Sequence, residues 1–191
     1  MSMKTNWMQI SPELAAMLHD ARPGMPAKGA AGVQSRVSVT FAIAKALFAV
    51  PVAPVVEILD IREIAPLPRT PPHVLGLIDR RGVSVPVVDM RLMLAQAPQE
   101  DTHETRIVVL RMSLGGERMG LVGLRVDRVI EVAELEDAGD GMLPEAELLQ
   151  WNERMVAGIA RRDGLFVTCL DVDNLFGQGV RAIAAHVVEA A

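Results

Sequence analysis

Apolar and polar or small residues alternate with a period of two from Arg36 onward. One face of this segment would carry Val37, Val39, Phe41 and Ile43, and the other would carry Ser38, Thr40, Ala42 and Ala44. Alternation of this kind predicts a strand with one buried face. The first strand that we expect therefore begins at Arg36 and is half-buried.

Further aliphatic runs predict more strands later in the chain. Residues 47–50 read as a second strand, and residues 54–58 as a short helical turn before the next extended segment. Residues 106–112 and 119–126 flank Gly115-Gly116, a pattern typical of a β-hairpin. Near the C-terminus the spacing becomes helical, with apolar residues at Val180, Ile183, Ala184, Val187 and Val188. We expect a mainly β fold that ends in a short helix over 178–191.

The chain repeats itself. The segment that begins at Val74 recurs from Val156, 82 positions later and without a gap. The identical pairs are Val74/Val156, Gly76/Gly158, Arg80/Arg162, Gly82/Gly164, Val85/Val167 and Asp89/Asp171. Residues 55–58 are also echoed at 129–132. The repeat predicts two small related β units, a first at about 36–100 and a second at about 104–177, joined through the polar segment 95–104.

Residues 1–35 form an extension ahead of the β region. Ser11-Pro12-Glu13 supplies an N-cap, a proline at the first helical position and an early acid, which predicts a short amphipathic helix over 12–21. Residues 22–32 are rich in Gly, Pro and Ala and indicate a linker. A helix that packs on its own domain is favoured over a separate partner-binding peptide.

Composition excludes several classes of protein. The net charge of −5 and an aromatic content of 3% without tyrosine argue against nucleic acid as a partner. The longest apolar run, 46–56, is shorter than a membrane span and is interrupted by prolines, and the N-terminus lacks the pattern of a signal peptide. We expect a cytoplasmic protein. Cys169, the single cysteine, reads as a small buried hydrophobe.

Catalytic and metal-binding templates are missing. The sequence has no phosphate-binding glycine loop, no G-x-S-x-G and no H-E-x-x-H, and its four histidines are scattered. We therefore expect no catalytic residue, metal or cofactor. Asp171 and Asp173 could form a carboxylate pair, but a cap on the short helical turn at 174–176 is favoured, and Asp89 in the other copy supports the cap.

The repeated glycines predict structural turns, at Gly76, Gly82, Gly158 and Gly164. Arg81 differs from them, because a guanidinium on a turn can offer several donors to a partner. A solvated surface arginine is an equally good interpretation of the pattern alone. Pro86, within 83–88, favours an edge strand or a bulge nearby.

Several segments in order resemble the CheW-like domain, the coupling module of bacterial chemotaxis signalling. They span about 37–176 and comprise 48–52, 55–58, Pro68, Pro71-Pro72, 76–78, 81–82, 85–89, 123–129, 158–159 and 170–176. The resemblance implies two five-stranded SH3-like β-barrels that share a core, with no catalysis. It also implies an adaptor between the tips of chemoreceptors and the regulatory domain of a CheA-type histidine kinase, located at receptor arrays and touching the membrane only through the receptor.

The resemblance also implies a partner-binding surface. Arg81 matches the arginine of the N-L-R-G turn of the family, and Val55, Glu57 and Ile58 match its V-x-E-I segment. Asp79-Arg80 replaces the usual Asn-Leu, and a changed charge at a docking turn alters selectivity more readily than fold. The alternatives are a scaffold of a chemosensory pathway outside swimming, such as surface motility or a second-messenger output, and a carboxylate-dependent hydrolase or metal-binding protein that uses Asp171 and Asp173.

Overall fold

The computed structural model describes residues 36–137 and 155–189. The predicted N-terminal helix and linker lie outside these residues. The strands are β1 (Arg36–Ile43), β2 (Ala46–Pro51), β3 (Val55–Asp60), β4 (Val74–Arg80), β5 (Val83–Asp89), β6 (Arg106–Gly115), β7 (Arg118–Val126), β8 (Arg128–Asp137), β9 (Val156–Arg162) and β10 (Leu165–Leu170). The helices are α2 (Met90–Met93), α4 (Val172–Leu175) and α5 (Gln178–Glu189).

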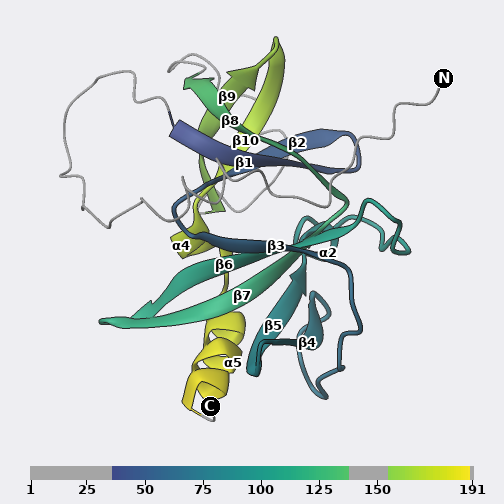
Figure 1. The fold of residues 1–191 in the computed structure, drawn as a ribbon, viewed down its shortest axis with the longest axis vertical. Helices are drawn as coiled ribbons and strands as arrows, with labels where there is room; N and C mark the ends of the chain where they lie inside the picture. The colour runs from purple at the N-terminus through teal and green to yellow at the C-terminus, as the bar shows by residue number, and fades with distance from the viewer. Residues whose placement is uncertain (1–35, 138–154, 190–191) are drawn as a thin grey trace. The chain divides into compact units, whose positions relative to one another are not determined.

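The strands form two five-stranded sheets (Figure 1). Sheet A closes into a barrel in the order β1-β2-β10-β9-β8. Sheet B curls in the order β3-β6-β7-β5-β4, and β3 and β4 are its two ends. The mainly β prediction with two five-stranded units is confirmed. The expected helical turn at 54–58 is wrong, because Val55–Asp60 is strand β3 and pairs with β6.

The two sheets do not follow the expected boundary near residue 100. Hairpin β1–β2 pairs with β8 and β10 from the second half of the chain, and hairpin β6–β7 pairs with β3 and β5 from the first half. The exchange runs through two parallel pairings, β2 with β10 and β5 with β7. The prediction of contiguous barrels at 36–100 and 104–177 is therefore wrong. Each sheet combines strands from both halves of the chain, because each half contributes one hairpin to the sheet of the other.

The internal repeat places equivalent strands in different sheets. Hairpin β4–β5 with α2 belongs to sheet B, and hairpin β9–β10 with α4 belongs to sheet A. Each short helix starts at an aspartate cap: Asp89 accepts from the amides of Arg91 and Leu92, and Asp171 accepts from those of Asp173 and Asn174. These bonds satisfy amide donors that a helix start leaves without partners. The cap interpretation of both aspartates is confirmed.

The repeated glycines serve two purposes. Gly82 and Gly164 lie in the turns β4–β5 and β9–β10 with φ of 81° and 78°, as predicted. Gly76 and Gly158 lie inside β4 and β9, each at a shift in strand register, so the prediction that they form turns is wrong. Gly76 has φ of 147°, and a Cβ there would lie 2.1 Å from the carbonyl oxygen of Ala65. The absence of a side chain lets the segment around Ala65 pair with the outer edge of β4.

A shared hydrophobic core joins the two sheets and α5. Phe41 and Phe48 of sheet A stack with their ring centroids 6.0 Å apart and belong to the same buried cluster as Leu124 of sheet B. Val180 and Ala184 of α5 enter this cluster. The helix expected at the C-terminus therefore packs on one face of sheet B. Smaller apolar clusters fill sheet B and sheet A separately.

Partly buried charges also connect the two sheets. Arg91, which follows the cap of α2, bonds Asp127 at 2.7 Å and 2.6 Å, and Asp127 accepts from the amide of Ala44 in the β1–β2 turn at 2.6 Å. Asp127 separates β7 of sheet B from β8 of sheet A. Burial alone would raise the pKa of Asp127, but the bond from Arg91, the Ala44 amide and the nearby positive charges outweigh it. The pKa of Asp127 therefore lies below its ordinary value.

A second buried pair fastens the polar segment that connects the halves. Arg125 of β7 bonds Asp89 at 2.9 Å, Asp101 at 2.7 Å and the carbonyl oxygen of Gln99 at 2.8 Å. The carboxylate of Asp89 thus caps α2 and neutralises a buried guanidinium at once. This pairing offsets part of the cost of removing both charges from water.

The difference between Gly76 and Gly158 predicts different responses to the same substitution. We expect Gly76→Ala to lower the free energy of unfolding by roughly 2 kcal/mol or more, because the new Cβ would collide with backbone. A Cβ at Gly158 meets no atom within 4 Å, so Gly158→Ala should cost much less. Urea unfolding of the two variants measures the difference, and equal losses would contradict the close approach of Ala65.

The bonds of Asp127 to Arg91 and to the Ala44 amide form a clamp between the sheets, the Asp127 clamp. This clamp predicts how the free energy of unfolding changes in acid. Because folding lowers the pKa of Asp127, its stabilisation is present above the ordinary pKa of 3.8 and is lost as the pH falls through the lower folded value. Asp127→Asn should lower the free energy of unfolding by about 2 kcal/mol at pH 7 and flatten its decline below pH ~4. Urea titrations across this range, with exposed Asp163→Asn as control, test both effects. If the free energy of unfolding of Asp127→Asn declined in acid as that of the wild type does, the clamp would be contradicted.

Candidate partner-binding surface

The β4–β5 turn presents Arg81 to solvent. Arg81 and Gly82 are the two turn residues, with φ of 55° and 81°. Positive φ at both positions is the geometry of a type I′ hairpin turn. The carboxylate of Asp79 accepts from the amide of Gly82 at 2.8 Å and fixes the turn. The Arg81 side chain, 79% exposed, therefore projects from a rigid support.

Glu57 lies beneath this turn, although it belongs to the opposite end of sheet B. The curl of the sheet brings β3 close to β4, and Glu57 Oε2 accepts from Nε of Arg80 at 2.7 Å. Glu57 Oε1 lies 3.6 Å from Nη2 of Arg81. The carboxylate is held mainly by the half-buried Arg80. Arg81 keeps most of its donors directed toward solvent.

The other two residues predicted for partner binding are less accessible. Val55 is 6% exposed and belongs to the core shared by the two sheets. Val55 is therefore too buried for the direct partner contact that we expected, and it supports β3 from the core instead. Ile58 is half-buried and packs against the same cluster. The accessible residues of the predicted set are Arg81, Glu57 and the outer part of Ile58.

Sheet A has the same ion pair at the equivalent place. Glu131 of β8 accepts from Nε of Arg162 of β9 at 3.0 Å, and this hydrogen bond raises the pKa of Arg162 above its ordinary value. Glu57/Glu131 and Arg80/Arg162 are equivalent positions of the repeat. A glutamate–arginine pair that joins the outer strands is therefore a structural property of both units.

Comparison of the two turns separates the structural arginine from the exposed one. Arg80 has an identical counterpart at Arg162, whereas Arg81 is replaced by Asp163 in the other unit. Sequence reasoning missed Arg80 as the partner of Glu57, although its identity across the repeat was the signal. Of these two turns, only the one in sheet B has an arginine at this position, and its guanidinium is exposed. An exposed guanidinium on a turn can bind a carboxylate of another molecule.

The described residues lack a metal-binding cluster, and Asp171 is engaged as a helix cap. Within 36–137 and 155–189, no three His, Cys, Asp or Glu side chains group as metal ligands. The carboxylate of Asp171 is engaged by two amides of α4 and by the side chain of Asn174. Among the helices of this part of the chain, none is long and apolar enough to cross a membrane.

Comparisons with known proteins identify relatives across most of the chain. The family model of the CheW-like domain matches residues 38–179. Chemotaxis protein CheW of Helicobacter pylori is 26% identical over 135 residues, covering 71% of this chain and 78% of the relative. Chemotaxis protein CheW of Rhizobium meliloti is 29% identical over 136 residues, covering 68% and 83%. The crystal structure of scaffolding protein TtCheW from Thermoanaerobacter tengcongensis has a TM-score of 0.62 at 24% identity, covering 77% of this chain and 96% of that one, and shares its fold.

The two adjacent arginines should differ in their effect on stability. We expect Arg80→Ala to lower the free energy of unfolding by about 1 kcal/mol, because it leaves the half-buried Glu57 without its main partner. Arg81→Ala should change it by less than ~0.5 kcal/mol. Urea unfolding of both variants tests this, and Glu57→Ala should reproduce the Arg80 loss. Equal losses for the two arginines would show that Arg81 also has a structural role.

Proposed function

Because the chain belongs to the CheW-like domain family, whose members are non-catalytic scaffolds, we propose that it couples chemoreceptor tips to the regulatory domain of a CheA-type histidine kinase. The observation that supports this proposal is the exposed Arg81, held on a rigid turn above the Glu57–Arg80 pair. An adaptor needs a preformed surface and no chemistry. The β4–β5 turn supplies part of such a surface, because bonds within the chain already hold Arg81 in place.

The proposed contact is with the receptor. Arg81 would pair with a carboxylate of the receptor tip, while Ile58 and the Glu57 carboxylate border the contact. Preorganisation favours this role, because a guanidinium on a fixed turn loses little freedom on binding. In this proposal the protein is cytoplasmic, meets the membrane only through the receptor, and works at receptor arrays without cofactor or nucleic acid.

A specific observation favours an alternative output for the same scaffold. Asp79, which stands where the family has asparagine, is exposed beside Arg81 and adds a negative charge to the turn. The charge of Arg80 is engaged by Glu57 and changes the outer surface less. A partner that reads this turn would need a different charge pattern. This favours a receptor set of a pathway outside swimming, with surface motility or a second messenger as output.

Substitution of Arg81 tests the proposed surface. We expect Arg81→Glu to abolish capture of the receptor from lysate of the source cell, because the new carboxylate would repel the receptor carboxylate that Arg81 attracts. The thermal midpoint should stay nearly unchanged. The measurement is a pull-down of the tagged full chain, with captured proteins identified by mass spectrometry. Arg128→Glu, at an exposed position on sheet A, is the matched control.

The identities of the captured proteins also distinguish the two pathways. A receptor and kinase of a swimming pathway would support the first proposal, and those of another output would support the alternative. Undiminished capture of the receptor by a folded Arg81→Glu protein would refute the assigned surface. Capture of neither protein, from lysate shown to contain both, would refute the coupling role.

A further inference from the structure

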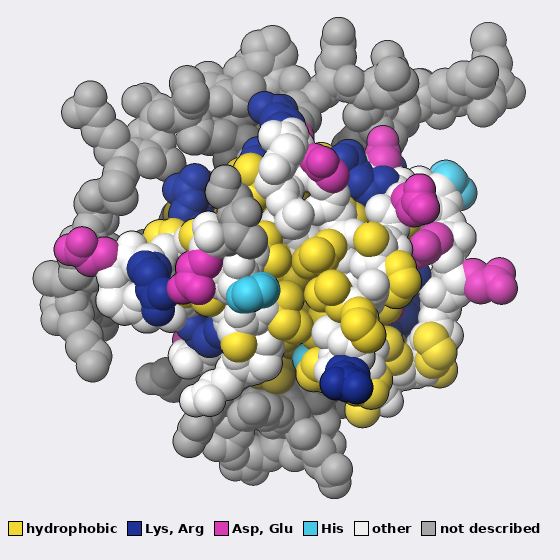
Figure 2. Space-filling view, turned by 90° about the horizontal axis from the view of Figure 1, so that it is seen from below, with side chains coloured by type: hydrophobic (Ala, Val, Ile, Leu, Met, Phe, Trp, Pro, Cys, Tyr) yellow, Lys and Arg dark blue, Asp and Glu magenta, His cyan; other side chains and the backbone are white. Residues whose placement is uncertain are grey.

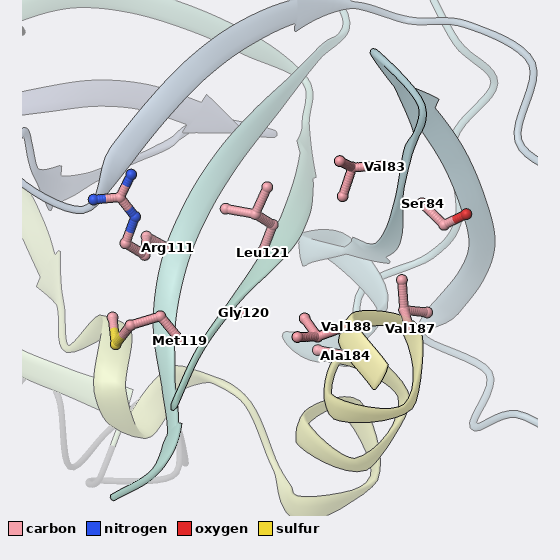
Figure 3. Close-up of a pocket in the computed structure, with 9 residues that line it drawn as sticks. All are labelled: Val83, Ser84, Arg111, Met119, Gly120, Leu121, Ala184, Val187 and Val188. Atoms are coloured by element: carbon pink, nitrogen blue, oxygen red, sulfur yellow. The ribbon is translucent and has the colours of Figure 1, made fainter. Parts of the chain in front are cut away.

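Sheet B contains an apolar groove where β5 and β7 separate. The two strands pair only at 87–89 with 123–125. Beyond this ladder they diverge, and the last turns of α5 lie against the gap (Figure 3). The groove has a volume of about 120 Å³ and is lined by Val83, Ser84, Arg111, Met119, Gly120, Leu121, Ala184, Val187 and Val188. A space of this size suits one aliphatic side chain.

The groove opens on an apolar surface. Met119 is 48% exposed, Val188 47% and Val83 38%, and these are three of the five large hydrophobic residues exposed in the described part of the chain. Hydrophobic side chains gather on the face that carries the end of α5 (Figure 2). Apolar residues that cluster on a surface in this way are typical of binding sites rather than of surface left to solvent.

One cation at the groove has no counter-ion within residues 36–137 and 155–189. The guanidinium of Arg111 is exposed and makes no ion pair with the described residues, whereas nearby Arg118 is paired with Glu189 at 3.2 Å. Figure 3 shows Arg111 at the border of the groove beside Met119 and Leu121. The groove therefore combines an apolar floor with a positive charge at one edge. Its complement is an aliphatic side chain with a carboxylate nearby.

The groove begins beside the turn that carries Arg81. Val83 and Ser84, which line one wall, directly follow Arg81 and Gly82 in the chain. A partner segment whose carboxylate paired with Arg81 would therefore lie close to Val83. Val83 is exposed at this junction and can contact both parts of such a segment.

We propose that this groove extends the receptor-binding surface. An aliphatic side chain of the receptor tip enters between β5, β7 and α5, and a carboxylate of the same segment pairs with Arg111. This inference rests on the function proposed above and adds a second anchoring point to it. It also gives α5 a role in recognition, because Val187 and Val188 form one wall of the groove.

The test is a titration of the purified full chain with the cytoplasmic fragment of the receptor identified in the pull-down. Arg111→Glu and Val188→Asp should each weaken affinity about tenfold, the first by charge repulsion and the second by placing a charge in the apolar wall. The Arg111→Glu effect should shrink as salt rises from roughly 50 to about 500 mM. Arg128→Glu and Leu165→Asp make the same changes at exposed positions of sheet A and should leave affinity unchanged.

The outcomes separate this inference from the proposed function. If Arg81→Glu loses the receptor while folded Arg111→Glu and Val188→Asp bind it normally, the groove proposal is overturned and the coupling surface stands. If all three bind normally, both fail. If Arg111→Glu and Val188→Asp reduce only self-association, measured by sedimentation, the groove takes a second copy of the chain and the proposal is wrong. Thermal midpoints near that of the wild type establish that each variant is folded.

Discussion

The exchange of hairpins between the two halves of the chain is the constraint on which the rest of the structure depends. Two parallel pairings, β2 with β10 and β5 with β7, connect segments that are far apart in sequence. Neither half contains all the strands of either sheet, so neither sheet can form without the other half. Packing between the sheets is therefore imposed by connectivity as well as by apolar burial. The strand order brings the two sheets together, and the Asp127 clamp and the shared core then stabilise the contact between them.

The repeat made part of this architecture predictable. It identified β4–β5 and β9–β10 as equivalent hairpins and Asp89 and Asp171 as equivalent caps, because local turn and cap chemistry is encoded by neighbouring residues. It could not indicate which hairpin completes which sheet. Two contiguous barrels and two barrels with exchanged hairpins satisfy the same periodicity, and the choice depends on contacts distant in sequence. The division near residue 100 failed for this reason, although the number and type of the units were correct.

The candidate site was predictable to a similar degree. The turn and its exposed Arg81 could be identified from local pattern and resemblance, because a two-residue turn ending in glycine is determined locally. The burial of Val55 could not, because a register shift in β3 directs both Val55 and Ile58 toward the core between the sheets. The pairing of Glu57 with Arg80 depends on the curl of sheet B. Only their echoes at Glu131 and Arg162 indicated it in the sequence.

The two sheets join their outer strands differently, and this bears on how the proposed surface works. In sheet A, backbone pairing between β8 and β9 closes the barrel, and the Glu131–Arg162 pair supplements it. In sheet B, β3 and β4 have no backbone ladder between them, and the Glu57–Arg80 pair bridges them by side chains. An ion pair of this exposure contributes about 1 kcal/mol or less, which is comparable with the net contribution of a single backbone hydrogen bond. A partner carboxylate at Arg81 would compete with Glu57 for the neighbouring guanidinium groups. The outer strands of sheet B are therefore joined at the turn that carries Arg81 by side chains alone, whereas those of sheet A are joined by backbone bonds as well.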